Sequence, residues 1–89
     1  MNLKKYTDTH GNYYEFSELK NSPTTIFIHG VGLDNTMWYP QKEYFRNKSV
    51  IFYDLLNHGQ SISGYRELSF AIYCNQLLNI INELKLVIN

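Results

Sequence analysis

The stretch 24-TTIFIHGVG-32 decides the fold, because a continuous apolar and β-branched run passes directly into a loop that contains glycine. Residues 24–28 show no alternation of polar and apolar side chains, which is typical of a strand covered on both faces of a parallel sheet. A second run of the same character, residues 49–53, is followed by Asp54 and a polar stretch with glycine. The sequence therefore predicts two parallel strands, each with a loop at its carboxyl end.

Further elements are predicted on both sides of these strands. Aromatic and β-branched residues surround a Gly/Asn/Asp cluster within residues 6–19, which indicates a β-hairpin. Residues 36–45 predict a short helix with Pro40 in its first turn. Ser69 is a candidate N-cap for an amphipathic helix of about four turns. Its apolar stripe is predicted to contain Phe70, Cys74, Leu77, Leu78, Ile81 and Leu84, with Asn75, Gln76, Asn79, Asn82 and Glu83 mostly opposite.

This order of elements predicts an α/β fold within a single domain, residues 1–89. Residues 86–88 are apolar again and predict the start of another strand, so two crossovers would build a parallel half-sheet after the hairpin.

Composition excludes several functional classes. Eight Lys and Arg balance eight Asp and Glu, which removes the electrostatic argument for binding nucleic acid or an anionic membrane surface. No apolar run approaches the roughly 18–20 residues of a membrane span, and no secretory signal is recognisable, so we expect a cytoplasmic protein. The one cysteine, Cys74, rules out an internal disulfide framework and a cysteine-only zinc site.

Two cofactor interpretations have little support in the sequence. Gly30 and Gly32 follow a strand and Asp54 ends the next one, as in a dinucleotide fingerprint, but Asn35 stands where its third glycine would be. His29, Asp34, Asp54 and His58 could in principle bind a metal, yet they lack ligand spacing. We expect neither cofactor nor metal, and the dinucleotide-binding βαβ unit stays a minor alternative.

Two loop motifs, one after each strand, carry a family resemblance. The strand ending in 29-HGVG-32, with Trp38 a few positions later, resembles the oxyanion loop of the α/β-hydrolase family. The next strand runs into 54-DLLNHGQS-61, which is similar to that family's Asp-x-x-Gly-His-Gly-x-Ser turn. The resemblance covers roughly residues 24–88, and the hairpin matches the antiparallel strands that open the fold. It implies a partial α/β-hydrolase fold.

The resemblance also implies roles for individual residues. The backbone N–H of Val31 would be an oxyanion donor, in a loop shaped by His29, Gly30 and Gly32. We expect His29 to brace this loop, and Trp38 to line a pocket or pack the first helix. The second motif would be a structural turn made by Asp54, Asn57, His58, Gly59 and Ser61. Asn57 replaces the family's glycine, and asparagine tolerates the left-handed backbone that such a turn needs.

The catalytic residues of such an enzyme are missing from the sequence. The family needs a nucleophile on a strand-to-helix elbow, then an acid and a histidine, and no Gly-x-Ser-x-Gly or equivalent is present. We therefore expect the amino-terminal part of a serine-type hydrolase for esters, lactones or related bonds, ending before the nucleophile elbow and inactive alone. The whole protein would take a small ester-like substrate.

The expected sheet has one open side. In the family's strand order the strand ending at Ile28 pairs with the nucleophile strand, so we expect an exposed apolar edge that favours self-association. The alternative function follows from the same edge. It is a self-standing small binding or interaction protein that uses the half-fold.

Overall fold

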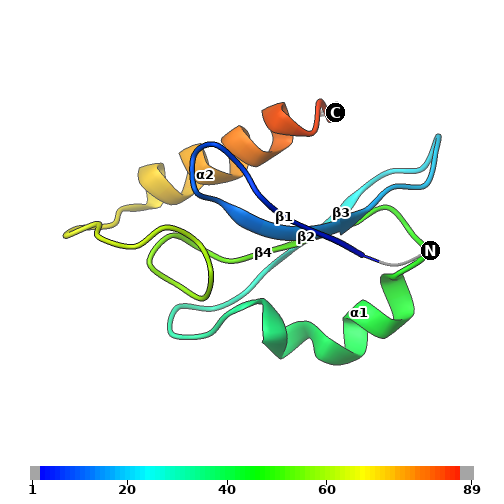
Figure 1. Ribbon diagram of the computed structural model, residues 1–89, viewed down its shortest axis with the longest axis horizontal. Helices are drawn as coiled ribbons and strands as arrows, with labels where there is room; N and C mark the ends of the chain where they lie inside the picture. Colours follow the sequence, from blue (N-terminus) through cyan, green and yellow to red (C-terminus); the bar gives the residue numbers. More distant parts are fainter. Residues whose placement is uncertain (1–2, 87–89) are drawn as a thin grey trace.

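The computed structural model describes residues 3–86, which form a four-stranded mixed sheet between two helices (Figure 1). The strands are β1 (Lys4–Thr7), β2 (Tyr13–Ser17), β3 (Thr25–Ile28) and β4 (Val50–Tyr53), in the spatial order β1-β2-β4-β3. The pairs β1–β2 and β2–β4 are antiparallel, and β3–β4 is parallel. The predicted α/β class, with an opening hairpin and a partial parallel half-sheet, is confirmed. Residues 87 and 88 of the predicted last strand lie outside the described residues.

The two faces of the sheet carry different cores. On the side of α2 (Phe70–Glu83), the buried cluster contains aromatic and aliphatic side chains from three elements and a loop: Tyr14, Ile51, Tyr53, Leu55 and Ile80. On the side of α1 (Tyr39–Phe45), Phe27 stacks on Phe52 with ring centroids 4.8 Å apart and also contacts Trp38 and Phe45. Alternate residues of β3 and β4 therefore contribute to opposite cores, as the pleat requires.

Burial on both faces is complete for β4 and partial for β3. All four residues of β4 are buried, whereas Thr25 and Ile28 at the two ends of β3 are exposed. In the middle of β3, Ile26 packs against the core on the side of α2 and Phe27 against Trp38 and Phe45 on the side of α1. The predicted cover on both faces is therefore confirmed in the middle of β3 and fails at its ends. Within residues 3–86, β3 is an edge strand with β4 as its one partner.

The predicted helix over residues 36–45 is divided into two parts. The chain enters through a 3-10 helix, η1 (Asn35–Trp38), and continues as α1 with Pro40 in its first turn. Proline has no N–H and its ring crowds the carbonyl four residues earlier, so a continuous α-helix cannot pass through this position. Asp34 caps η1, because its side chain accepts a hydrogen bond from the Thr36 N–H at 2.8 Å.

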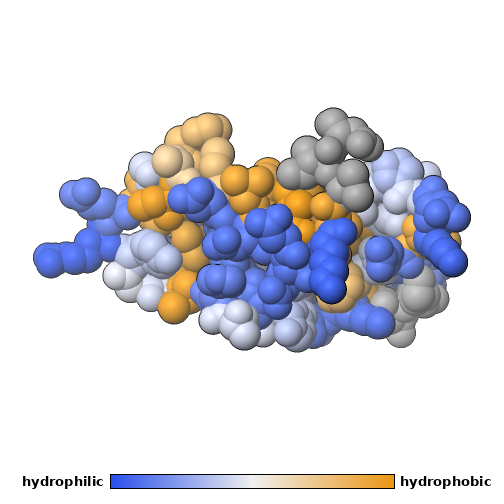
Figure 2. Space-filling view, turned by 90° about the horizontal axis from the view of Figure 1, so that it is seen from above, coloured by the Kyte–Doolittle hydropathy of each residue, from blue (hydrophilic) through white to orange (hydrophobic). Residues whose placement is uncertain are grey.

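The capping of α2 is confirmed, but its buried face differs from the predicted stripe. Ser69 caps the helix by accepting from the Ile72 N–H at 3.2 Å. Phe70 is 84% exposed and Leu78 is also exposed, whereas Gln76, predicted on the opposite side, is buried. Gln76 faces the sheet because its amide bonds the backbone after β4. The outer face of α2 is mixed, because Asn75, Asn82 and Glu83 are exposed beside Phe70 and Leu78. Figure 2, which looks onto this side of the molecule, shows hydrophilic side chains next to hydrophobic ones.

We predict that Ile80→Ala and Phe70→Ala have very different effects on stability. Ile80 is completely buried in the core cluster, so removing its side chain should lower the free energy of unfolding by about 2–5 kcal/mol. Phe70→Ala in the same helix should change it by less than about 0.5 kcal/mol. Urea denaturation followed by circular dichroism measures both. Equal losses would show that Phe70 belongs to the buried face after all.

Candidate functional site

The loops that follow β3 and β4 meet at one end of the sheet. We call residues 29–34 the first loop and residues 54–61 the second loop. Parallel strands bring their carboxyl ends to the same edge, where α/β proteins usually bind ligands. Two histidines connect the loops, since the Leu55 N–H donates to His29 Nε2 at 2.9 Å and the Gly32 N–H donates to His58 Nε2 at 3.0 Å. The two loops therefore form one hydrogen-bonded unit.

Asp54 is the centre of this unit. Its side chain is fully buried, and Oδ1 accepts from both the backbone N–H and the side-chain amide of Asn35, each at 2.7 Å. Oδ2 accepts from the Gln60 N–H at 2.8 Å. The Asp54 carbonyl accepts from the Ser61 hydroxyl at 2.6 Å and from Gln76 Nε2 at 2.8 Å. Because three donors already occupy the carboxylate, it is not available to a ribose hydroxyl, which counts against a dinucleotide site.

The two ring nitrogens of His29 contact both loops. The side chain is buried, and Nδ1 lies 2.8 Å from the Gly30 carbonyl while Nε2 accepts from the second loop. A backbone N–H can only donate, so Nε2 carries the lone pair and the ring proton is on Nδ1. His29 is thus a neutral, fully hydrogen-bonded imidazole.

The second loop uses two left-handed residues. Asn57 has a φ of 65°. Its Nδ2 donates to the Tyr65 carbonyl at 2.8 Å and its Oδ1 accepts from the Tyr65 N–H at 3.1 Å. A glycine at this position could make neither hydrogen bond. Gly59 has a φ of 49°, and a Cβ there would collide with the Asp54 carboxylate. The Ser61 hydroxyl is buried and also accepts from the Tyr13 N–H at 3.0 Å. The Asn57 amide and the Ser61 hydroxyl are thus both engaged within the protein.

The tip of the first loop is open by comparison. Val31 is 77% exposed, and the Leu33 N–H closes a turn by donating to the Gly30 carbonyl at 3.1 Å. Gly32 has a φ of 89°, a conformation that glycine adopts readily. Gly30 lies outside the left-handed region and a Cβ there would make ordinary contact, so the need for glycine falls on Gly32. Within residues 3–86 no hydrogen bond of the Val31 N–H is found.

An open cavity of about 680 Å³ separates the two loops. Its lining combines residues 32–34, 36, 37 and 57–59. Asp34 stands on one wall, and the Thr36 hydroxyl and N–H that donate to its carboxylate lower its pKa. Trp38 does not line this cavity but packs on Phe27, with ring centroids 4.9 Å apart.

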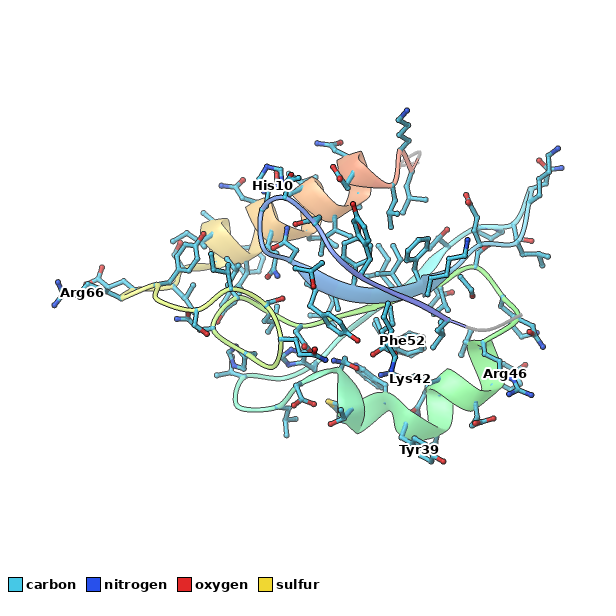
Figure 3. All side chains as sticks on the ribbon, in the orientation of Figure 1. His10, Tyr39, Lys42, Arg46, Phe52 and Arg66 are labelled. Atoms are coloured by element: carbon cyan, nitrogen blue, oxygen red, sulfur yellow. The ribbon has the colours of Figure 1, made fainter. Side chains whose placement is uncertain are left out.

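A buried network of polar side chains connects β2 with η1 and α1, and the sequence did not predict it. Lys42 of α1 points toward Phe52 of the sheet (Figure 3). Its Nζ lies 3.0 Å from Glu15 Oε1 and also bonds the side-chain oxygen of Asn35. The Tyr13 hydroxyl donates to Glu15 Oε2 at 2.6 Å, and burial together with this hydrogen bond raises the tyrosine's pKa. The signal was a lone carboxylate among the aromatic residues of β2, facing Phe52, its partner in β4.

Neither a metal centre nor a membrane helix is found in the described part of the chain. Among residues 3–86, no three His, Cys, Asp or Glu side chains gather closely enough to hold a metal ion. No helix there has the length and apolar character to cross a membrane. The His29 and His58 rings are neighbours, with centroids 5.3 Å apart.

Comparison with known proteins finds no matching family model, but it does find similar sequences and structures. The chain is 36% identical over 76 residues to (E)-2-((N-methylformamido)methylene)succinate hydrolase of Acinetobacter baylyi. The match covers 78% of this chain and 28% of that hydrolase. The chain spans about a quarter of the length of the curated relatives it matches.

Two solved structures superpose on nearly the whole chain. An N-acyl homoserine lactonase, AidH, in complex with N-hexanoyl homoserine lactone, matches with a TM-score of 0.74 and 25% identity, over 97% of this chain and 34% of its own. An α/β hydrolase fold protein from Burkholderia ambifaria matches with a TM-score of 0.69 and 23% identity, over 93% and 31%. The chain therefore has a partial α/β-hydrolase fold and resembles an amino-terminal part of that fold.

Proposed function

We propose that this chain supplies one half of the oxyanion hole of a serine-type hydrolase, with the backbone N–H of Val31 as the donor. One observation carries the proposal. At the loop tip the Gly32 N–H is taken by His58, whereas the neighbouring Val31 N–H has no partner among residues 3–86. Attack on an acyl carbon creates an oxyanion, which prepositioned N–H groups stabilise best.

The rest of the two loops would hold this donor still. Asp54, through Asn35, anchors the end of the first loop, and the two histidines tie its start and its tip to the second loop. A donor held before the reaction needs no reorganisation when charge develops, and this is the source of its catalytic value. In this proposal Asp54, Asn57, His58, Gly59 and Ser61 are structural.

The nucleophile, acid and base would come from polypeptide outside this sequence. Ser61 is unsuited to attack a substrate, because its hydroxyl is buried and both its donor and acceptor functions are engaged. The chain alone would then be inactive toward esters and lactones. The lactonase and the succinate-derivative hydrolase that it resembles act on small molecules, which supports a small acyl substrate for the whole protein. Exposed Leu33 and Met37 give the cavity an apolar wall for such a substrate.

A second candidate function is a self-standing interaction protein that pairs through β3. The support is the open edge, where β3 has one partner within residues 3–86 and Ile28 is 49% exposed. Unpaired N–H and C=O groups along a strand are a template for another strand. We propose a second copy of the chain as the partner in this case.

The oxyanion role predicts a specific effect of Val31→Pro. The parent is a chimera in which this chain replaces the matching segment of the Acinetobacter hydrolase. Proline removes the N–H, and it suits the second position of a turn whose third residue has a positive φ, as Gly32 has. We expect kcat to fall about 10²–10³-fold, measured on the hydrolase's own substrate.

The matched control is Val31→Ala, which keeps the N–H and should retain the parent's kcat within a factor of about three. A folded Val31→Pro chimera with undiminished kcat would contradict the proposal. A folded but inactive parent chimera would also count against it, because the loops would then not serve a hydrolase active site.

The interaction function predicts that association depends on the β3 edge. Sedimentation of the chain should show a mass that rises with concentration, and Ile28→Lys should abolish the rise because a charge on an open edge opposes pairing. Thr7→Lys, on the exposed strand β1 at the other edge, is the control and should leave association unchanged. A monomer at every concentration would sink this candidate.

A further inference from the structure

Building on the oxyanion role proposed for Val31, we infer that His58 is a positioning residue that holds the tip of the first loop only while its imidazole is uncharged. The starting point is the reciprocal arrangement of the two histidines. His29 of the first loop accepts from Leu55 of the second, and His58 of the second accepts from Gly32 of the first. The His58 contact lies directly beside the free N–H of Val31.

The hydrogen bonds of His58 determine its protonation state. The Gly32 N–H is a donor, so Nε2 must present a lone pair to it at 3.0 Å. Nδ1 lies 2.8 Å from the Leu56 carbonyl, which can only accept, so the ring proton is on Nδ1. The backbone of His58 is itself tied into its loop, because its N–H donates to Leu55 and its carbonyl accepts from Ser61. The ring is therefore fixed on its own side and offers one acceptor to the other loop.

A second proton would remove that acceptor. Protonated Nε2 would direct an N–H at the N–H of Gly32, while the bond from Nδ1 to Leu56 would persist. The His58 ring would keep its position, and the tip of the first loop would move away from it. Nothing lies within 4 Å of the Cβ position of Gly32, so the tip has open space to move into. The Val31 donor, one residue away, would lose its fixed direction.

Three groups around His58 set the charge balance of this switch. Asp34, on the facing wall of the cavity, has a lowered pKa because Thr36 donates to it, and its negative charge favours a cation nearby. Asp54 lies in the same loop, but its carboxylate is engaged by Asn35 and Gln60. The His29 ring, with its centroid 5.3 Å from that of His58, is neutral and buried against a backbone N–H. His58 is the more exposed of the two histidines.

The experiment is a pH titration of the full ¹⁵N-labelled chain by NMR, from about pH 8 to about pH 5, the range in which an imidazole normally titrates. We expect the Gly32 amide resonance to move with the same midpoint as the ring of His58, and its protection from hydrogen exchange to fall as the pH drops. The Leu55 amide reports on His29 separately. His10→Gln, at an exposed hairpin turn, is the control and should leave the Gly32 titration unchanged.

Two variants separate positioning from mere structure. His58→Gln supplies a side-chain oxygen that accepts but does not titrate, so the Gly32 amide should stay bonded and independent of pH. His58→Phe should give the unbonded Gly32 resonance at every pH; if it fails to fold, the parent titration and His58→Gln still decide. The inference is overturned if Gly32 does not follow the ring of His58, or if it titrates equally in His58→Gln. These NMR readouts do not depend on catalytic activity, so they are independent of the chimera experiment. If the Gly32 amide titrates as expected but the Val31→Pro chimera keeps its kcat, the role of His58 in positioning the loop is retained and only its connection to catalysis is refuted.

Discussion

A buried carboxylate at the end of β4 is the constraint on which the rest of the site depends. An ionised carboxylate is expensive to bury unless donors surround it, and Asp54 meets three of them in Asn35 and Gln60. Supplying those donors fixes the start of η1 and the course of the second loop. Gly59 has no side chain because the carboxylate occupies the space beside it. The backbone carbonyl of Asp54 accepts a hydrogen bond from Gln76, and this bond turns the Gln76 side of α2 toward the sheet.

A second polar layer connects this carboxylate to the opposite side of the sheet. Lys42 reaches from α1 to Glu15 in β2 and to the side chain of Asn35, which in turn donates to Asp54. Half-buried charges of this kind stabilise a structure only when their hydrogen bonds are complete, and here each charge has a partner. These hydrogen-bonded side chains form a rigid support under the short, exposed tip of the first loop. A backbone donor that is to be prepositioned requires such a support.

Local patterns predicted most of the architecture, and pairings distant in sequence account for the rest. The hairpin, both parallel strands, the Ser69 cap and the first-turn Pro40 follow from neighbouring residues alone. Gln76 was assigned to the outside of α2 because it is polar and lies among the polar positions of the helix. Its neighbours in the sequence do not indicate that its side chain bonds the backbone after β4. Asn35 read as a missing glycine, whereas its role is to bond a carboxylate 19 residues away. Polar contacts across loops leave no periodic trace in a sequence.

Each loop supplies a histidine that accepts a hydrogen bond from the backbone of the other loop, so the two loops depend on each other. Each loop contributes the ring that the other loop's backbone needs, so neither can drift in sequence or be transplanted alone without leaving one backbone N–H unmatched. Substitutions at positions 29 and 58 should consequently be accepted together in related chains. A designer moving this site to another scaffold would have to carry both strand ends, their spacing and both rings.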